Sequence, residues 1–326
     1  MRQAGRALPE YRERKGDVPI LDALRDPALA AELTLQPVRR LGVDAAILYS
    51  DIVTPVHAIG FGIDIKAGIG PVTSVPFRSA ADLQRLRPLE PDVDLAWQAE
   101  TIRLLARESP VPVIGFAGAP FTVASYLVEG GPSREQAKTR TLMRADPQLW
   151  AALLDRLVDI AVASLRSQVA AGAAAVQVFD SWAGSLAPAT YRASVLPAMQ
   201  RLFAGLDDLG VPRIHFGVGT GELLGLLAEA GADVIGVDWR VPLDEAARRL
   251  GPGAVLQGNL DPIALLAGPE IAVSEMRLVL EAADRGRRDH GLAGHIANLG
   301  HGVLPETDPG VLGAVVDAVH AWPNPP

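Results

Sequence analysis

Cysteine is absent from the 326-residue sequence. Its absence excludes disulfide bonds and metal sites that are held by thiolates. A chain of this length can bury a large hydrophobic core, so it does not need disulfide bonds or a structural metal for stability. The lack of disulfides is compatible with a reducing compartment, and we expect a cytoplasmic protein.

The sequence also lacks an excess of basic residues and a long uninterrupted apolar run. Lysine and arginine number 30 against 38 acidic residues, and the formal net charge of −8 argues against non-specific nucleic-acid binding. A few arginines in a cleft can still bind an anionic substrate. The most apolar stretch, residues 157–179, contains Asp159 and Arg166, so it predicts a buried helix that leads into a strand, not a membrane span. The first residues form no apolar run of the signal-peptide kind, so we expect no leader.

Short apolar runs alternate with longer amphipathic segments, as in proteins built from βα units. The runs are nearly continuous in apolar character, which is typical of parallel strands buried on both faces. The economical interpretation is an α/β fold with a (β/α)8 barrel of the TIM type, a single domain over residues 1–326; the alternative is a doubly wound open sheet. An eighth strand is less clear, because residues 71–76 could instead form a hairpin arm with residues 61–66. The seven predicted strands are residues 45–50, 111–117, 174–179, 213–217, 234–237, 254–258 and 296–300.

Polar residues follow most of these strands. The carboxyl ends of parallel strands in a barrel meet at one rim, where the active sites of such barrels lie, so these side chains are expected to converge. An acidic residue in this position can also simply cap the next helix, and Asp261-Pro262 has the form of a helix start. The strand-end residues are Asp51, Asp180, Ser181, Asp238, Asn259, Asp261, Asn298 and His301.

Other polar positions give weaker signals. His215 lies inside a predicted strand and is expected to be packed and hydrogen-bonded. Residues 217–222 (GVGTGE) resemble a phosphate-binding loop, but they lack the G-x-G-x-x-G spacing and the Lys-Ser/Thr of a P-loop. A tight turn into the following helix explains this segment adequately.

Basic residues gather at the start of the chain. Gly5 and Pro9 argue against a stable helix there, so a loop is expected. Two interpretations stay open: a solvated basic stretch, or a group of arginines that binds carboxylates in a bidentate manner. The basic residues are Arg2, Arg6, Arg12, Arg14 and Lys15.

Five groups of residues carry a further signal through their order along the chain. They are residues 1–6 (MRQAGR) with 8–12 (LPEYR), 33–37 (LTLQP) with 47–52 (ILYSDI), 118–122 (GAPFT) with 126–130 (YLVEG), 179–184 (FDSWAG), and 298–302 (NLGHG). Each group is modest alone, but together the sequence resembles the uroporphyrinogen decarboxylase family over nearly its whole length. The family usually carries an aromatic residue where Ala7 stands, and it usually has residues before the first motif, which begins here at residue 1.

The resemblance implies a (β/α)8 barrel, in agreement with the alternating pattern, and a carboxy-lyase. Members of this family remove carbon dioxide from the four acetate side chains of uroporphyrinogen III and give coproporphyrinogen III in haem biosynthesis. They use no metal and no organic cofactor. The resemblance therefore implies a tetrapyrrole substrate and a homodimer, with neither nucleic acid nor membrane as a partner.

The resemblance also implies roles for individual residues. Asp51 is expected to stabilise the cationic pyrrole that forms when the ring is protonated. Arg2 is expected to help deliver the proton, although guanidinium is a very weak acid, and His301 is the competing donor. The expected catalytic residues are therefore Asp51, Arg2 and His301. The expected substrate-binding residues are Arg2, Gln3, Ala4, Gly5, Arg6, Asp51, Tyr126, Ser181 and His301.

Two other functions remain as alternatives. A non-catalytic tetrapyrrole carrier would keep the arginines but would not need Asp51 at the rim. A barrel methyltransferase of the same superfamily would hold zinc through cysteine, which this chain lacks.

Overall fold

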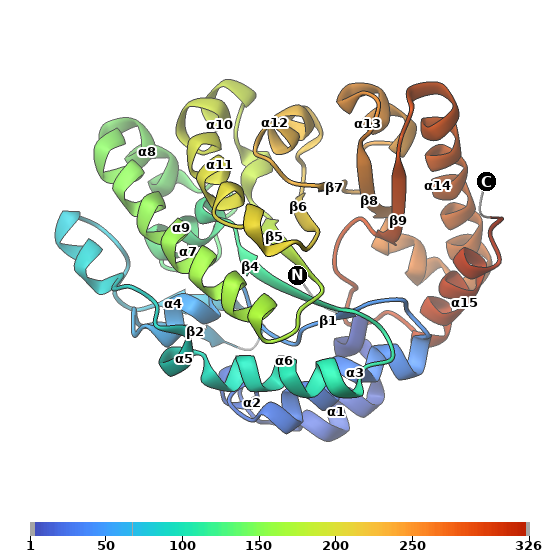
Figure 1. Cartoon of the computed structure of the whole chain (residues 1–326), viewed down its shortest axis with the longest axis horizontal. Helices are drawn as coiled ribbons and strands as arrows, with labels where there is room; N and C mark the ends of the chain where they lie inside the picture. The colour runs from blue at the N-terminus through green and yellow to red at the C-terminus, as the bar shows by residue number, and fades with distance from the viewer. Residues whose placement is uncertain (1–3, 67, 324–326) are drawn as a thin grey trace.

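The computed structural model describes residues 4–66 and 68–323. Seven parallel strands form one curled sheet, and helices surround it on the outside (Figure 1). The alternation of βα units and the seven strands predicted from the apolar runs are therefore confirmed. In spatial order the strands are β1 (Ala46–Ile47), β4 (Val113–Gly118), β5 (Ala175–Asp180), β6 (Arg213–Gly217), β7 (Val234–Gly236), β8 (Val255–Leu260) and β9 (Gly294–Leu299).

Many helices begin at proline, which suits the first helical position because the N–H group it lacks would have no partner there. Three of these helices follow an aspartate, Asp26, Asp146 or Asp308, whose carboxylate accepts a hydrogen bond from the first turn. Asp261 likewise accepts from Ile263 N–H at 2.9 Å, so the predicted helix start is confirmed. The α-helices are α1 (Pro9–Lys15), α2 (Ile20–Leu24), α3 (Pro27–Leu41), α4 (Thr54–Ala58), α5 (Pro91–Asp94), α6 (Ala96–Glu108), α7 (Pro120–Glu129), α8 (Ala137–Ala145), α9 (Pro147–Ala170), α10 (Pro188–Ser194), α11 (Leu196–Ala204), α12 (Leu224–Glu229), α13 (Leu243–Leu250), α14 (Pro269–His290) and α15 (Pro309–His320).

Two local predictions need revision. The N-terminal segment is not a plain loop, because a short 3-10 helix, η1 (Ala4–Ala7), leads into α1, and Pro9 occupies the first position of that helix. The uncertain eighth strand does not join the main sheet. Instead β2 (Ile63–Lys66) pairs with β3 (Gly70–Thr73) as an antiparallel hairpin. The other 3-10 helices are η2 (Ala80–Arg85), η3 (Ala183–Ser185), η4 (Asp207–Leu209), η5 (Gly221–Leu223) and η6 (Pro262–Ala267).

The strands present alternate residues to the inside of the curl and to the surrounding helices, as the period of two requires. Phe116 and Phe179 face the inside, and their rings meet edge to face at 5.2 Å. Phe216 of β6 continues this row at 6.1 Å from Phe179. Val176 and Val178, the intervening residues of β5, pack into the large cluster under the helices. The core therefore has an inner aromatic row and an outer aliphatic layer.

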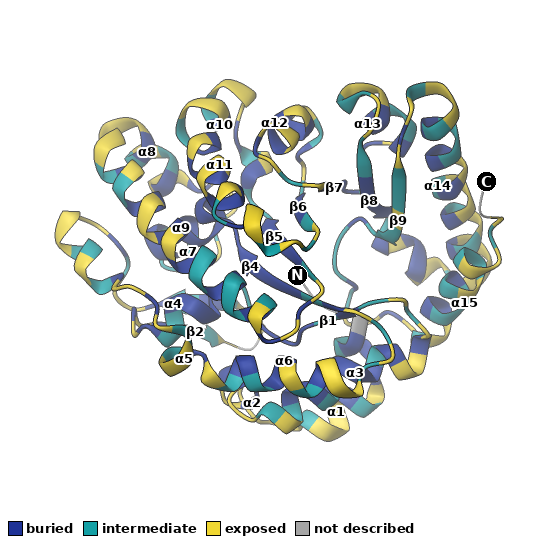
Figure 2. Cartoon of the chain, in the orientation of Figure 1, coloured by how far each residue is buried: buried dark blue, intermediate teal, exposed yellow. Residues whose placement is uncertain are grey.

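The two ends of the sheet, β1 and β9, are not paired with each other. β8 is almost entirely buried, whereas every residue of β9 is at least partly exposed, and Figure 2 shows this contrast between the two neighbouring strands. Within the described residues the sheet is thus a curled seven-stranded sheet with an open side between β1 and β9, and an eighth strand is not seen.

Glycines allow the loops at the carboxyl ends of the strands to approach one another closely. A Cβ atom on Gly300, just after β9, would overlap the backbone nitrogen of Trp239 and lie 3.1 Å from the carbonyl oxygen of Asn259. Gly313 in α15 offers a contrast, because a Cβ atom there would meet nothing within 4 Å.

Gly300→Ala should therefore lower the free energy of unfolding by about 1–3 kcal/mol, since the backbone of a neighbouring loop must move. Gly313→Ala should raise it by up to about 1 kcal/mol, because alanine is the better helix former. Urea denaturation followed by circular dichroism measures both. Equal effects of the two substitutions would refute the close approach at Gly300.

Candidate active site

Three of the candidate residues stand at the carboxyl ends of strands, on one rim of the sheet. Asp51 follows β1 by four residues, Ser181 follows β5 directly, and His301 follows β9 by two residues. Because all seven strands run parallel, these positions share one end of the fold. The convergence expected from the sequence is thus present in the backbone.

The Asp51 carboxylate is fixed by the turn that leads into α4. Its Oδ1 accepts a hydrogen bond from Val53 N–H at 3.1 Å, and the Asp51 N–H donates to Thr54 Oγ1 at 3.3 Å. The residue is half-buried, at the mouth of the curl. Asp51 therefore offers an oriented carboxylate with access to a bound molecule.

Helix α3 ties the N-terminal segment to the end of β1. Tyr49 N–H donates to Thr34 Oγ1 at 2.9 Å, and the Thr34 hydroxyl donates to Ala30 O at 2.7 Å. A Cβ atom on Gly5 would lie 2.9 Å from Pro37 Cγ, so only glycine lets η1 lie this close to α3. The first two motif groups of the sequence are therefore in direct contact.

Arg6 lies beside the ring of Tyr49, two residues before Asp51. Its guanidinium carbon is 5.7 Å from the centre of the Tyr49 ring, and its buried Nε has no hydrogen-bond partner among the described residues. Burial raises the pKa of Tyr49 most, the hydrogen bond with Tyr11 adds to this, and the charges of Arg6 and Asp51 act on it in opposite directions. The charges of Arg6 and Asp51 thus both act on the Tyr49 side chain. The Nε–H group of Arg6 can donate a hydrogen bond to an anion.

Tyr126 and Trp182 form an aromatic pair beside Asp51. Their ring centres are 4.1 Å apart with an interplanar angle of 33°. Burial raises the pKa of Tyr126, and the negative charge of Asp51 raises it further, so the phenol keeps its proton as a hydrogen-bond donor. Trp182 was not among the residues expected from the sequence. Its place in residues 179–184, two positions past a strand end, was the available signal.

The His301 ring is oriented by its own loop. Gly302 N–H donates to His301 Nδ1 at 2.6 Å, which puts the ring proton on Nε2. The Trp239 ring packs against it with 6.1 Å between ring centres. A histidine held in this tautomer presents an N–H donor from Nε2, which suits a substrate carboxylate.

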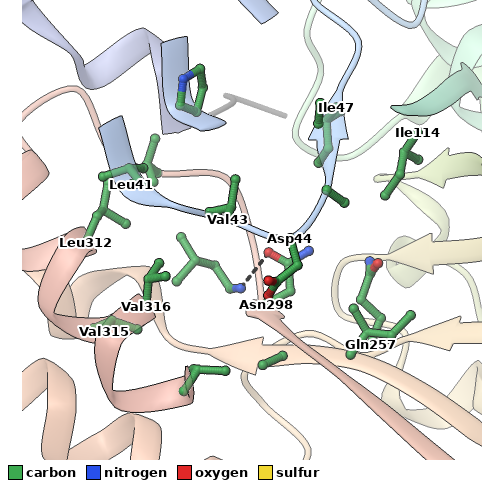
Figure 3. A pocket seen from close by; sticks show the side chains of 18 of the residues that line it. Leu41, Val43, Asp44, Ile47, Ile114, Gln257, Asn298, Leu312, Val315 and Val316 are labelled. Atoms are coloured by element: carbon green, nitrogen blue, oxygen red, sulfur yellow. Dashed lines mark hydrogen bonds between the residues drawn. The ribbon is translucent and has the colours of Figure 1, made fainter. Parts of the chain in front are cut away.

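A cavity of about 530 Å³ runs along the open side between β1 and β9. In Figure 3, Leu41 lies beside Leu312, with Val315 and Val316 on the same side of the cavity, and Ile47 and Ile114 lie on the other side; Asn298 and Gln257 are polar members. Among the candidate residues, Asp51 and His301 line it, whereas Arg6, Tyr126 and Ser181 do not. The cavity is therefore mainly the opening of the sheet, and it reaches the candidate site at one end.

Several expected residues do not contribute to this geometry. Arg2 and Gln3 lie outside the described residues, as does the side chain of Ala4. Asp238 is buried and accepts from Gly219 N–H and from Arg240, so the segment 217–222 is the tight turn that was preferred over a phosphate loop.

The expectation for His215 is only half correct. The ring is fully buried against Phe203, with 5.3 Å between ring centres. However, neither ring nitrogen has a hydrogen-bond partner among the described residues, and Nε2 is 3.9 Å from Asp180 Oδ2. The helix layer leaves the ring packed but not hydrogen-bonded.

Over residues 4–66 and 68–323, no three histidine or acidic side chains gather closely enough to hold a metal ion. In the same part of the chain, the longest helices carry too many polar residues to cross a membrane.

Comparison of structures gives the class of protein. A methyltransferase from Methanosarcina mazei superposes with a TM-score of 0.74 at 23% identity, covering 94% of this chain and 89% of the other. A B12-independent methionine synthase from a Shewanella species gives a TM-score of 0.57 at 14% identity, with 92% and 88% of the two chains covered. At these identities the likeness shows the fold alone: an α/β protein with a parallel sheet and a polar rim.

Comparison of sequences gives the family. The sequence profile described as Uroporphyrinogen decarboxylase (URO-D) matches residues 1–322. Proteins named uroporphyrinogen decarboxylase from Streptomyces coelicolor and Nocardia farcinica are 61% and 59% identical over 321 residues, covering 98% of this chain and 88% and 90% of theirs. The chain belongs to the uroporphyrinogen decarboxylase family.

The electrostatics along the cavity predict how stability depends on pH. His295 of β9 is partly buried in the cavity wall, and its Nε2 is 2.7 Å from Gly258 O. Desolvation lowers the pKa of His295, the charge of Arg287 acts in the same direction, and the contact with Gly258 O opposes both. The unfolded chain therefore binds the proton more readily than the folded one, so the stability from this group is complete above about pH 6.5 and falls below it.

His295→Gln removes this group and should make the fall in the free energy of unfolding between pH 7 and pH 5 shallower than in the wild type. His290→Gln, at the last residue of α14 and outside the cavity lining, is the control and should leave the slope unchanged. Denaturant titrations at several pH values measure the slope. A slope that is the same in His295→Gln and the wild type would contradict the lowered pKa of His295 in the folded protein.

Proposed function

We propose that this chain catalyses the cofactor-independent decarboxylation of the four acetate side chains of uroporphyrinogen III, giving coproporphyrinogen III in porphyrin biosynthesis. Membership of the family and relatives of that name at 56–61% identity support a carboxy-lyase. The observation that carries the proposal is the placement of Asp51 at the rim, within electrostatic reach of Tyr126 and of Tyr49, whose ring lies beside Arg6.

The reaction needs a place for an electron pair. Protonation of the ring carbon next to the one that bears the acetate arm makes the ring cationic. The bond to the carboxylate then breaks, carbon dioxide leaves, and the electron pair forms a double bond from the ring to the methylene carbon. A second proton on that carbon gives the methyl group, and the ring returns its proton. Each cycle thus replaces one carboxylate with one proton, and no other co-reactant is consumed.

Asp51 carries the central role in this proposal. An ionised carboxylate accepts hydrogen bonds from pyrrole N–H groups and stabilises positive charge as it develops. The hydrogen bond from Val53 N–H holds one oxygen in place, so the carboxylate does not have to reorient during the reaction. A neutral side chain of the same shape would bind the ring but would not stabilise the cation.

The remaining residues bind the carboxylates and deliver the proton. Arg6 and Arg2 supply guanidinium groups for carboxylates, and Tyr126, Ser181 and His301 donate hydrogen bonds. Proton delivery falls to Arg2 or His301, and the Nε2–H tautomer of His301 favours a role as carboxylate ligand. The pocket lining is completed by Gln3, Ala4 and Gly5.

We further propose the finer features of the fold and its setting. The curled sheet is the larger part of a (β/α)8 barrel in a single domain, and the eighth strand position lies between β1 and β9. Supporting this, β1 and β9 are the two ends of the strand order, and an apolar cavity lies between them. A homodimer in the cytoplasm completes the proposal and rests on the family resemblance.

The alternatives have less support. A tetrapyrrole carrier would not need an oriented carboxylate at the rim, whereas this chain has one in Asp51. The methyltransferase likeness is confined to the fold at 23% identity, and a zinc site held by cysteine is impossible in this sequence.

The direct test is an anaerobic incubation of the full-length protein with uroporphyrinogen III, followed by chromatography of the oxidised porphyrins. The expected result is stepwise loss of four carboxylates, ending at coproporphyrin. Binding of the substrate without any loss of carboxylates would favour the carrier instead.

Asp51→Asn should lower kcat on the order of a hundredfold or more with a smaller change in KM, because it removes charge but keeps shape. Asp44→Asn is the matched control, since Asp44 lines the same cavity and its exposed side chain pairs with His320. Asp44→Asn should keep wild-type kinetics. Wild-type turnover by Asp51→Asn would refute the electrostatic role.

A further inference from the structure

A buried carboxylate lies behind the candidate site and has no part in the mechanism above. Asp180, the last residue of β5, is fully buried and faces the helix layer. Its Oδ1 accepts from the Thr122 hydroxyl at 2.8 Å, and Tyr191 OH of α10 donates to Oδ2 over a long 3.5 Å. A carboxylate in such surroundings is costly to bury unless donors satisfy it, so its contacts are strongly preferred.

Thr122 links the buried Asp180 carboxylate to the turn at the rim of the sheet. While its hydroxyl donates to Asp180, its Oγ1 accepts from Trp182 N–H at 3.2 Å. The hydrogen bonds thus run from Trp182 through Thr122 to Asp180 and close a loop between α7 and the turn after β5. The Ala119 N–H bond to Phe179 O at 2.9 Å joins the same two elements one turn earlier.

The two aromatic residues of the site depend on these contacts. Tyr126 follows Thr122 by four residues on α7, so both side chains lie on one face of the helix. Thr122 holds the backbone of Trp182, and Tyr126 stacks on its ring at 4.1 Å. Ser181 lies between Asp180 and Trp182 in the chain. One buried carboxylate therefore fixes the positions of Tyr126, Trp182 and Ser181 together.

We propose that Asp180 is a positioning residue for substrate binding, which acts through Thr122 to hold Tyr126 of α7 against the Ser181–Trp182 turn. This inference rests on the proposed decarboxylase function. Asp180 does not touch the substrate. Its loss displaces two hydrogen-bond donors for substrate carboxylates, so it raises KM more than it lowers kcat, which is the reverse of the effect expected for Asp51.

Thr122 offers a matched pair of variants. Thr122→Val keeps the shape but removes the hydroxyl, whereas Thr122→Ser keeps the hydroxyl and removes one methyl group. The valine variant should lose roughly tenfold in kcat/KM, mainly through KM, since small displacements of binding groups are costly. The serine variant should restore most of this loss. Thermal unfolding in parallel separates a kinetic effect from a loss of folded protein.

Tryptophan fluorescence gives a readout that does not depend on turnover. Each background is compared with its Trp182→Phe version, which isolates the emission of Trp182 from the other four tryptophans. The Trp182 emission should change in Thr122→Val and not in Thr122→Ser, because only the former loosens the stack with Tyr126. An inactive wild type would refute the proposed function. The fluorescence comparison would still test whether the Thr122 hydroxyl holds Trp182 against Tyr126.

Two kinetic results would overturn the inference. Wild-type kinetics in Thr122→Val would show that the hydroxyl positions nothing, and an equal loss in Thr122→Ser, which keeps the hydroxyl, would show that the hydroxyl does not account for the effect. If Thr122→Val does not fold, Asp180→Leu decides, because it keeps the approximate size but removes both oxygens that accept from Thr122 and Tyr191. It should raise KM severalfold, and an unchanged KM would overturn the proposal.

Discussion

The hydrogen bond from Tyr49 N–H to Thr34 Oγ1 is the contact on which the arrangement of the site depends. It ties α3 to the end of the shortest strand, β1, which has only two residues in the sheet. Asp51 follows two residues after Tyr49, and η1 with Arg6 packs on the same helix through Gly5 and Pro37. A single buried hydroxyl therefore links the carboxylate and the arginine, which come from segments 45 residues apart. The Thr34 hydroxyl accepts from Tyr49 N–H and also donates to Ala30 O in its own helix, so both its donor and an acceptor site are used.

Close backbone approaches explain why the sequence motifs are specific. A Cβ atom on Gly118 would lie 2.9 Å from Ile52 Cβ, which brings the ends of β4 and β1 together. One on Gly184 would overlap the carbonyl of Val218, and one on Gly300 would overlap the Trp239 nitrogen. These three motif glycines thus mark close contacts between segments at the carboxyl ends of the strands. Four of the five motif groups include a strand end of the one parallel sheet, at β1, β4, β5 and β9.

Much of this could be predicted from the sequence, because the informative patterns are local. Buried parallel strands have continuous apolar runs, and the helix starts at Asp-Pro pairs are set by the first turn alone. The N-terminal segment was misjudged because Pro9 was taken as a breaker, although it is favoured as the first residue of a helix. His215 was expected to be hydrogen-bonded, but its partners depend on how α11 packs, which no local pattern encodes. Trp182 was missed because its importance comes from Tyr126, 56 residues away in the chain.

Asp51 and Asp180 look alike in the sequence, since each stands at the end of an apolar run. The period of two along β5 distinguishes them. Phe179 faces the inside of the curl, so Asp180 faces the helices, where its carboxylate meets Thr122, Tyr191 and His215. Asp51 lies beyond the last paired residue of β1, where a turn and not the pleat sets its direction. An acidic residue within a strand, such as Asp180, must point to one face of the sheet. An acidic residue in the turn after a strand, such as Asp51, can be oriented toward a ligand. The same residue type therefore organises the site in one case and supplies its charge in the other.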